Sequence, residues 1–210
     1  MTIKTLVKSV VSAVLVTALT STVSTAALAA GSAEAGKDKV ATCAACHGAS
    51  GNDSVLPNVP KLGGQGERYL LKQLTEIKAD TRKVPLMTPI LTSLNEQDLA
   101  DIAAYLATLP APLGAVKKTE LTLGQQLYRA GNAKINIPAC TGCHAPDGKG
   151  NTSAGYPTLS GQDTPYVEVQ LKAFRSGDRS NDQSNVMRMV TERLTDKEIA
   201  ALASYVAGLH

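Results

Sequence analysis

A pentapeptide with the pattern C-x-x-C-H occurs twice in this chain, 97 residues apart, at 43–47 and again at 140–144. Two cysteines at this spacing can add to the two vinyl groups of one haem, while the adjacent histidine binds its iron. The pattern therefore predicts two covalently attached haem c groups. The predicted attachment residues are Cys43, Cys46, Cys140 and Cys143, and the predicted iron ligands are His47 and His144.

Other uses of these four cysteines fit the spacing less well. Zinc ribbons place two C-x-x-C pairs about 15–20 residues apart, whereas here the separation is 97. Disulfides in an exported chain would leave the histidine after each pair unexplained. A thioredoxin-like redox pair would lie in a βαβ pattern, and no strand-rich stretch flanks either motif. Haem attachment accounts for the cysteines and the histidines together.

The first 29 residues have the features of a secretory signal peptide. Lys4 and Lys8 precede an apolar run from Val10 to Leu19, and residues 27–29, Ala-Leu-Ala, form a small-x-small cleavage pattern. A retained membrane anchor is the alternative, but six Ser or Thr residues dilute the second part of the segment, and a membrane span needs about 20 predominantly apolar residues. We therefore predict a signal peptide over residues 1–29 and export to the periplasm.

The charge of the chain gives no sign of a nucleic-acid partner. The formal net charge of +3 falls to +1 once the two lysines of the leader are removed. The propionates of two haems would then make the loaded protein acidic, and no run of basic residues remains. We expect no nucleic-acid binding.

The repeat extends well beyond the cysteines. At the offset of 97, Pro-x-Leu-x-Gly at 60–64 aligns with the same pattern at 157–161. The second half then carries three extra residues, so that an offset of 100 aligns Met87 with Met187. Further equivalent pairs are Gln65 and Gln162, Tyr69 and Tyr166, Arg82 and Arg179, Leu94 and Leu194, and Tyr105 and Tyr205. This internal duplication predicts domains at 30–108 and 121–210, joined by a proline-containing linker at 109–120.

Each half is predicted to be a set of short α-helices, because apolar residues recur at helical spacing and no period-2 stretch competes. In the first half the expected helices run from about Gly36 to the attachment turn, over 67–80, and onward from a cap at Asn95. Their counterparts are 124–129, a helix containing Tyr166 to Phe174, and a helix capped by Thr195 with Glu198. The predicted buried stripes of the last helices are Leu99, Ile102 and Leu106, and Ile199, Leu202 and Val206. The predicted fold class is all-α.

A count of histidines limits how the two irons are coordinated. The chain has three histidines, and the two motifs use His47 and His144. The third, His210, is the last residue and can serve one iron at most. Two histidine ligands at each iron are therefore impossible, and we interpret His210 as a solvated terminus.

Methionine sulfur supplies the remaining candidate ligands. Met87 lies 40 residues after the first motif, between Pro85 and Pro89, in a segment rigid enough to hold a sulfur on the iron. In the second half Met187 and Met189 compete, and the repeat alignment favours Met187, with Met189 predicted to pack in the core. Because a histidine and a methionine fill both axial positions, this set favours one-electron transfer over chemistry on a bound substrate.

Two further pairs of residues are candidates for contacts around the haems. A ligating histidine usually donates its second ring N–H to an acceptor, and the carbonyls of Pro60 and Pro157, each 13 residues after its histidine, are suitably placed. Arg82 and Arg179 hold equivalent places and either pair with propionates or are solvated surface charges.

The chain resembles the class I cytochromes c, and specifically the periplasmic dihaem family called cytochrome c4. The resemblance rests on the two C-x-x-C-H motifs, the two Pro-x-Leu-x-Gly loops, the segment 179–182 ahead of Met187, and the closing segment 200–205. It implies two tandem class I cytochrome c domains related by pseudo-twofold symmetry, with propionates facing each other across the interface. The shorter segment 81–85 in the first half departs from that symmetry and suggests unlike haem environments.

The resemblance also implies a periplasmic one-electron carrier, not an enzyme, whose partners are redox proteins such as a terminal oxidase and a quinol-oxidising complex. Peripheral membrane association is an additional expectation. Two alternatives stay open. One is the electron-accepting dihaem subunit of a larger oxidoreductase, such as a sulfide-oxidising flavoprotein. The other is a dihaem peroxidase or thiosulfate-oxidising enzyme, which needs an iron with an open position.

Overall fold

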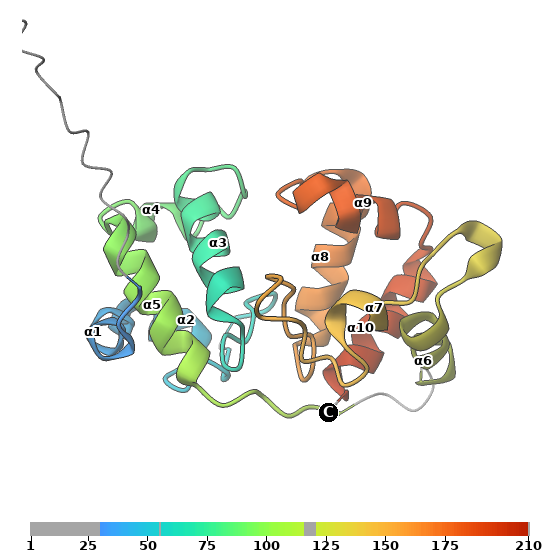
Figure 1. The fold of residues 1–210 in the computed structure, drawn as a ribbon, viewed down its shortest axis with the longest axis horizontal. Coiled ribbons are helices and arrows are strands. Elements are labelled where there is room, and N and C mark those ends of the chain that lie inside the picture. The colour runs from blue at the N-terminus through green and yellow to red at the C-terminus, as the bar shows by residue number, and fades with distance from the viewer. Residues whose placement is uncertain (1–29, 55, 116–120, 210) are drawn as a thin grey trace, which may run out of the picture.

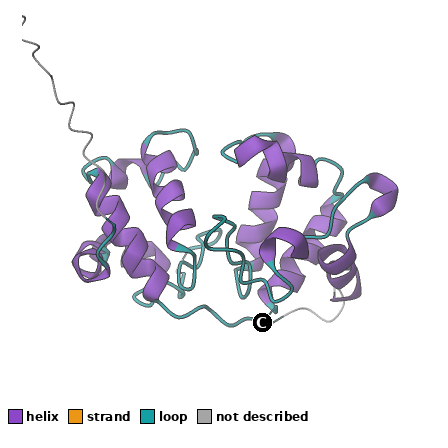
Figure 2. Cartoon of the chain, in the orientation of Figure 1, coloured by secondary structure: helices purple, strands orange, loops and turns teal. Residues whose placement is uncertain are grey.

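The structure is a computed structural model that describes residues 30–54, 56–115 and 121–209. Over those ranges the chain is helical, without β-strands, and two isolated β-bridges join Asn132 to Ile137 and Asn151 to Tyr156 (Figure 2). Two groups of helices lie side by side and are joined by an extended segment (Figure 1). The predicted all-α fold with two tandem units is confirmed. The predicted signal peptide and part of the predicted linker, 116–120, lie outside the described residues.

The first unit contains the helices α1 (Ala33–Lys39), α2 (Ala41–His47), α3 (Glu67–Lys78), α4 (Thr88–Leu91) and α5 (Glu96–Thr108). The single helix predicted from Gly36 to the attachment turn is wrong, because the chain turns at Val40, with ψ of 0°, and begins a second helix. Val40 packs against the core of the unit, which holds this turn in place. At Asn95 the predicted cap is confirmed, with Asp98 completing a capping box.

The second unit contains α6 (Leu121–Ala130), η2 (Ala133–Ile135), α7 (Thr141–His144), α8 (Thr164–Ser176), η3 (Gln183–Asn185), α9 (Val186–Thr191) and α10 (Asp196–Ala207). The predicted capping box of Thr195 with Glu198 is present at the start of α10. The additional length before the second motif folds as a small loop, closed by the bridge between Asn132 and Ile137. No helix in the described ranges is long and apolar enough to cross a membrane.

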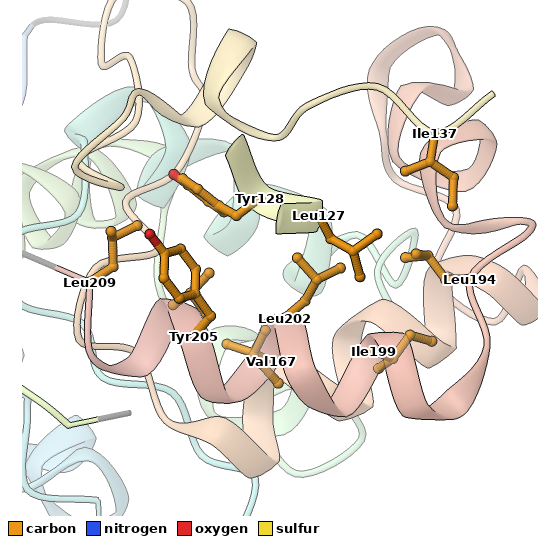
Figure 3. Packing of buried hydrophobic residues seen from close by; sticks show 11 residues of the cluster. Leu127, Tyr128, Ile137, Val167, Leu194, Ile199, Leu202, Tyr205 and Leu209 are labelled. Atoms are coloured by element: carbon orange, nitrogen blue, oxygen red, sulfur yellow. The ribbon is translucent and has the colours of Figure 1, made fainter. Parts of the chain in front are cut away.

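Each unit has its own hydrophobic core, which α3, α4 and α5 form in the first unit and to which α6, α8 and α10 contribute in the second. All six residues of the predicted stripes on α5 and α10 are buried. In the second core Tyr128 of α6 and Tyr205 of α10 pack with their ring centroids 5.4 Å apart, and Leu127, Ile199 and Leu202 extend the contact (Figure 3). The packing of the last helix against the first fixes the frame that carries each attachment motif.

An ion-pair cluster fastens α1 to α5. The Lys39 ammonium lies 2.6 Å from a carboxylate oxygen of Asp101 and 2.7 Å from one of Asp98. The backbone N–H of Ser32 also donates to Asp101, at 2.9 Å. These bonds, first that from Lys39 and then that from Ser32, lower the pKa of Asp101 to about 2.

This lowered pKa predicts how the first unit responds to acid. Because the folded-state pKa lies below the ordinary value of about 3.9, the Asp101 carboxylate contributes fully above about pH 4 and loses its contribution as the pH falls toward about 2. We expect Asp101→Asn to have a lower thermal midpoint than the wild type at pH 7. Near pH 2 the two midpoints are expected to lie closer together. Circular dichroism follows unfolding at both pH values. Asp80→Asn breaks only an exposed ion pair with Lys83 and is expected to leave the midpoint unchanged. An equal loss for Asp101→Asn at both pH values would contradict the role of this charge.

Candidate haem sites

The first attachment motif lies on α2 and ends at its C-terminus. Cys43 and Cys46 are three residues apart, so that both thiols lie on one side of the helix. His47 is buried, and its Nδ1 lies 2.8 Å from the carbonyl oxygen of Pro60. Burial lowers the pKa of His47, which favours a neutral imidazole. With Nδ1–H donating to Pro60, the other ring nitrogen, Nε2, is the one available to bind a metal.

The second motif repeats this arrangement on α7. Cys140 caps the helix, Cys143 follows within it, and the buried His144 ends it. The His144 Nδ1 lies 3.0 Å from the carbonyl oxygen of Pro157, and burial again lowers the imidazole pKa. Both proline carbonyls predicted as acceptors therefore lie at hydrogen-bond distance from their histidines. Tyr156 packs beside His144, with ring centroids 6.2 Å apart.

All four cysteines are free and half-buried. Burial raises the pKa of the Cys43 thiol and raises that of Cys140 to about 11. The thiols of these two residues are therefore protonated at neutral pH, and none of the four is tied up in a disulfide. Four free cysteines are what thioether attachment of two haems requires.

The methionines differ in how much of each side chain is buried. Met87 caps α4 and packs against the core of the first unit. Met187 lies half-buried in the first turn of α9, whereas Met189 is 61 % exposed. The prediction that Met189 packs in the core is wrong. Residues two positions apart point to nearly opposite sides of a helix, which accounts for a half-buried Met187 beside an exposed Met189.

The two arginines of the repeat lie at the boundary between the units. Arg82 is 9 % exposed and donates to Gln73, at 2.8 Å, and across the boundary to the Tyr166 hydroxyl, at 3.0 Å. Arg179 donates in the opposite direction, to Gln73 at 3.0 Å and to the Tyr69 hydroxyl at 3.2 Å. The interpretation as a solvated surface charge is wrong for Arg82, which is buried, whereas Arg179 is half-buried.

These surroundings fit a haem in each unit. Arg82 is buried and forms no ion pair with a carboxylate of the described chain, although a buried cation requires a compensating charge. Haem propionates would supply it. An apolar hollow lined by Val40, Leu62 and Leu106 also opens beside the first motif. A haem held here supplies an iron that changes between the ferrous and ferric states.

Comparison with known proteins gives consistent matches over the described domains. The cytochrome c family profile matches residues 33–110 and 121–210. Cytochrome c4 from Azotobacter vinelandii is 51 % identical over 192 residues, which cover 87 % of this chain and 91 % of the relative. The crystal structure of reduced recombinant cytochrome c4 from Pseudomonas stutzeri superposes with a TM-score of 0.84 at 50 % identity, covering 86 % of this chain and 100 % of that one.

A more distant relative carries a different description. The thiosulfate dehydrogenase electron acceptor of Stutzerimonas stutzeri strain A1501 is 35 % identical over 170 residues, which cover 80 % of this chain and 78 % of the relative. The cytochrome c4 of Azotobacter vinelandii and this electron acceptor both align with most of the chain, and the cytochrome c4 has the higher identity.

Proposed function

The chain belongs to the cytochrome c family, as a dihaem cytochrome c4 and thus an electron carrier with covalently bound haem c, and we propose that it shuttles single electrons in the periplasm through two irons that each have histidine and methionine ligands. The observation that carries this proposal is the duplicated site. Each unit contains a buried histidine that is hydrogen-bonded to a proline carbonyl, and a repeat-equivalent methionine that is partly buried.

The proposed assignments follow the repeat. Thioether bonds form at Cys43 and Cys46 in the domain spanning 30–108, and at Cys140 and Cys143 in the domain spanning 121–210. The iron ligands are His47 with Met87 and His144 with Met187. The linker is 109–120, and the signal peptide spans 1–29. The exposure of the Met189 side chain supports Met187 as the methionine ligand of the second iron.

A carrier of this kind is not an enzyme. An iron held by a histidine and a methionine would have no open position for a substrate. The four ligand residues would therefore hold the irons and leave each haem to exchange single electrons with redox partners. A terminal oxidase and a quinol-oxidising complex are the partners we propose, with contacts small enough for transient encounters.

Measurements of iron coordination and of reduction potential in the native protein test this function. We expect a potentiometric titration of the holoprotein to show two one-electron steps, and the ferrous protein to bind no carbon monoxide at neutral pH. Resolved steps are expected because segment 81–85 and its longer counterpart before Met187 give the two haems unlike surroundings. Carbon monoxide binding at either iron in the native protein would contradict the closed coordination and favour an enzyme.

The electron-accepting subunit of a larger oxidoreductase is the second candidate. It is supported by the 35 % identity with a thiosulfate dehydrogenase electron acceptor. Size-exclusion chromatography of a native periplasmic extract separates the two possibilities. Elution at the size of the free chain supports the shuttle, whereas stable co-elution with an oxidoreductase supports the subunit.

A further inference from the structure

Two equivalent glutamines cross the boundary between the domains. The side chain of Gln65 accepts a hydrogen bond from the backbone N–H of Thr158, at 3.1 Å, and donates to the carbonyl oxygen of Thr158, at 2.6 Å. Gln162 forms the reverse pair with Lys61, at 2.8 Å for each bond. Both glutamines are buried, with 7 % and 5 % of their surface exposed. Since Gln65 and Gln162 are repeat partners, as are Lys61 and Thr158, the contact is pseudo-twofold symmetric.

Each of these contacts leads directly to a haem-binding histidine of the other domain. The N–H of Thr158 and the carbonyl of Pro157 belong to one planar peptide group, and that carbonyl is the hydrogen-bond partner of His144. A continuous chain of hydrogen bonds therefore runs from Gln65 in the first domain, through the 157–158 peptide, to the imidazole of His144 in the second.

The reverse path has the same form. The N–H of Lys61 donates to Gln162, and it belongs to the same peptide group as the carbonyl of Pro60, which is the hydrogen-bond partner of His47. The axial histidine of each domain is thus connected to a glutamine that the opposite domain supplies.

The chemical effect of such a chain has a definite direction. A hydrogen bond to the N–H of a peptide polarises its carbonyl and makes that oxygen a stronger acceptor. A stronger acceptor at Nδ1–H makes the imidazole a more basic ligand. A more basic ligand stabilises the ferric iron, which carries more positive charge than the ferrous iron, and so lowers the reduction potential.

We propose that Gln65 and Gln162 are positioning residues that tune the iron of the opposite domain, Gln65 through His144 and Gln162 through His47. The inference rests on the proposed histidine ligation. It adds a path, specific to the two-domain chain, by which each domain lowers the potential of the other's haem.

Crossed effects on the two haem potentials test this proposal. We expect Gln65→Met, which keeps the side-chain volume and removes both hydrogen bonds, to raise the potential of the second-domain haem and to change that of the first-domain haem less. Gln162→Met is expected to do the opposite. Potentiometric titration followed by NMR, with the haem methyl signals assigned to each domain, resolves the two haems. Gln65→Asn, polar but too short to reach Thr158, repeats the test without introducing an apolar group.

Thr158→Val is the matched control. The Thr158 hydroxyl donates to the carbonyl of Gly64 across the same boundary, at 2.9 Å, but it is not part of the peptide path. Its loss is expected to shift the second-domain potential less than Gln65→Met does. Equal shifts in both haems, a shift confined to the glutamine's own domain, no shift, or an equal effect of Thr158→Val would overturn the proposal.

The failure of this inference is distinguishable from failure of the proposed function. Haem content of two per chain and a native helical circular dichroism spectrum establish that each variant is folded. Carbon monoxide binding to the wild-type protein would count against closed His/Met coordination. If the wild-type protein excludes carbon monoxide but the glutamine variants do not shift the potential of the opposite domain's haem, only the glutamine path is contradicted.

Discussion

Met87→Ala is expected to lower the reduction potential of the first-domain haem and to open its iron to external ligands. Thioether ligation raises the potential of a haem relative to nitrogen ligation, and axial ligands set haem potentials over a range of roughly 0.8 V. We expect a fall on the order of 0.1 V or more for this haem. Potentiometry measures the fall, and carbon monoxide binding to the ferrous variant detects the open position.

The second domain supplies both a parallel test and an internal control. Met187→Ala is expected to act on the second haem as Met87→Ala acts on the first. Met189→Ala is expected to leave both potentials and the carbon monoxide response unchanged, because this side chain is 61 % exposed on the other side of α9. The assignment of Met187 would be wrong if Met189→Ala, and not Met187→Ala, removed the far-red charge-transfer band of methionine–iron ligation.

Features that depend only on short segments of sequence could be predicted for this protein. The C-x-x-C-H pairs indicated the cofactor, and the repeat offset indicated two domains and the equivalence of Met87 with Met187. The capping boxes at Asn95 and Thr195 are also local, since each needs only a residue and its third neighbour. Their agreement with the structure follows from that locality.

Features that depend on tertiary contacts were not predictable in the same way. The break between α1 and α2 at Val40 follows from packing against the core, which helical periodicity does not encode. The burial of Arg82 at the domain boundary depends on partners such as Tyr166, 84 residues away. Gln65 and Gln162 were visible as repeat partners, but their contacts with the opposite domain appear only once the domains are docked.

The three residues that distinguish the second half also required the structure for interpretation. They fall in the segment that forms η3, where Ser184 and Asn185 adopt left-handed backbone angles. Just beyond it, Arg188 pairs with Asp182 at 2.8 Å, and the first domain has Thr88 at the position of Arg188. The segment before Met187 therefore differs from the segment before Met87 in its backbone path and in its ion pair, which is a physical basis for two different potentials.

Gly36→Ala is expected to destabilise the first domain strongly, because α1 crosses α5 at this glycine. A Cβ atom at Gly36 would lie 2.0 Å from the carbonyl oxygen of Asp101, a backbone atom that cannot rotate away. Gly124 occupies the equivalent crossing of α6 with α10, where a Cβ atom would lie 2.3 Å from the carbonyl oxygen of Ala201. Relieving such overlap requires the helices to separate, and overpacking of this kind costs about 1–3 kcal/mol or more.

Gly142→Ala, within the second attachment motif, is the control for the substitutions at Gly36 and Gly124. Gly142 lies between Cys140 and Cys143 in α7, where an added Cβ atom meets nothing within 4 Å, and the first motif has Ala45 at the same place. Gly142→Ala is therefore expected to be neutral or to stabilise by up to about 1 kcal/mol, since alanine loses less backbone entropy in a helix. Thermal unfolding of the three holoprotein variants makes the comparison. Equal midpoints would show that the two crossings have room for a methyl group, and that close helix contact is not what holds the attachment motifs in place.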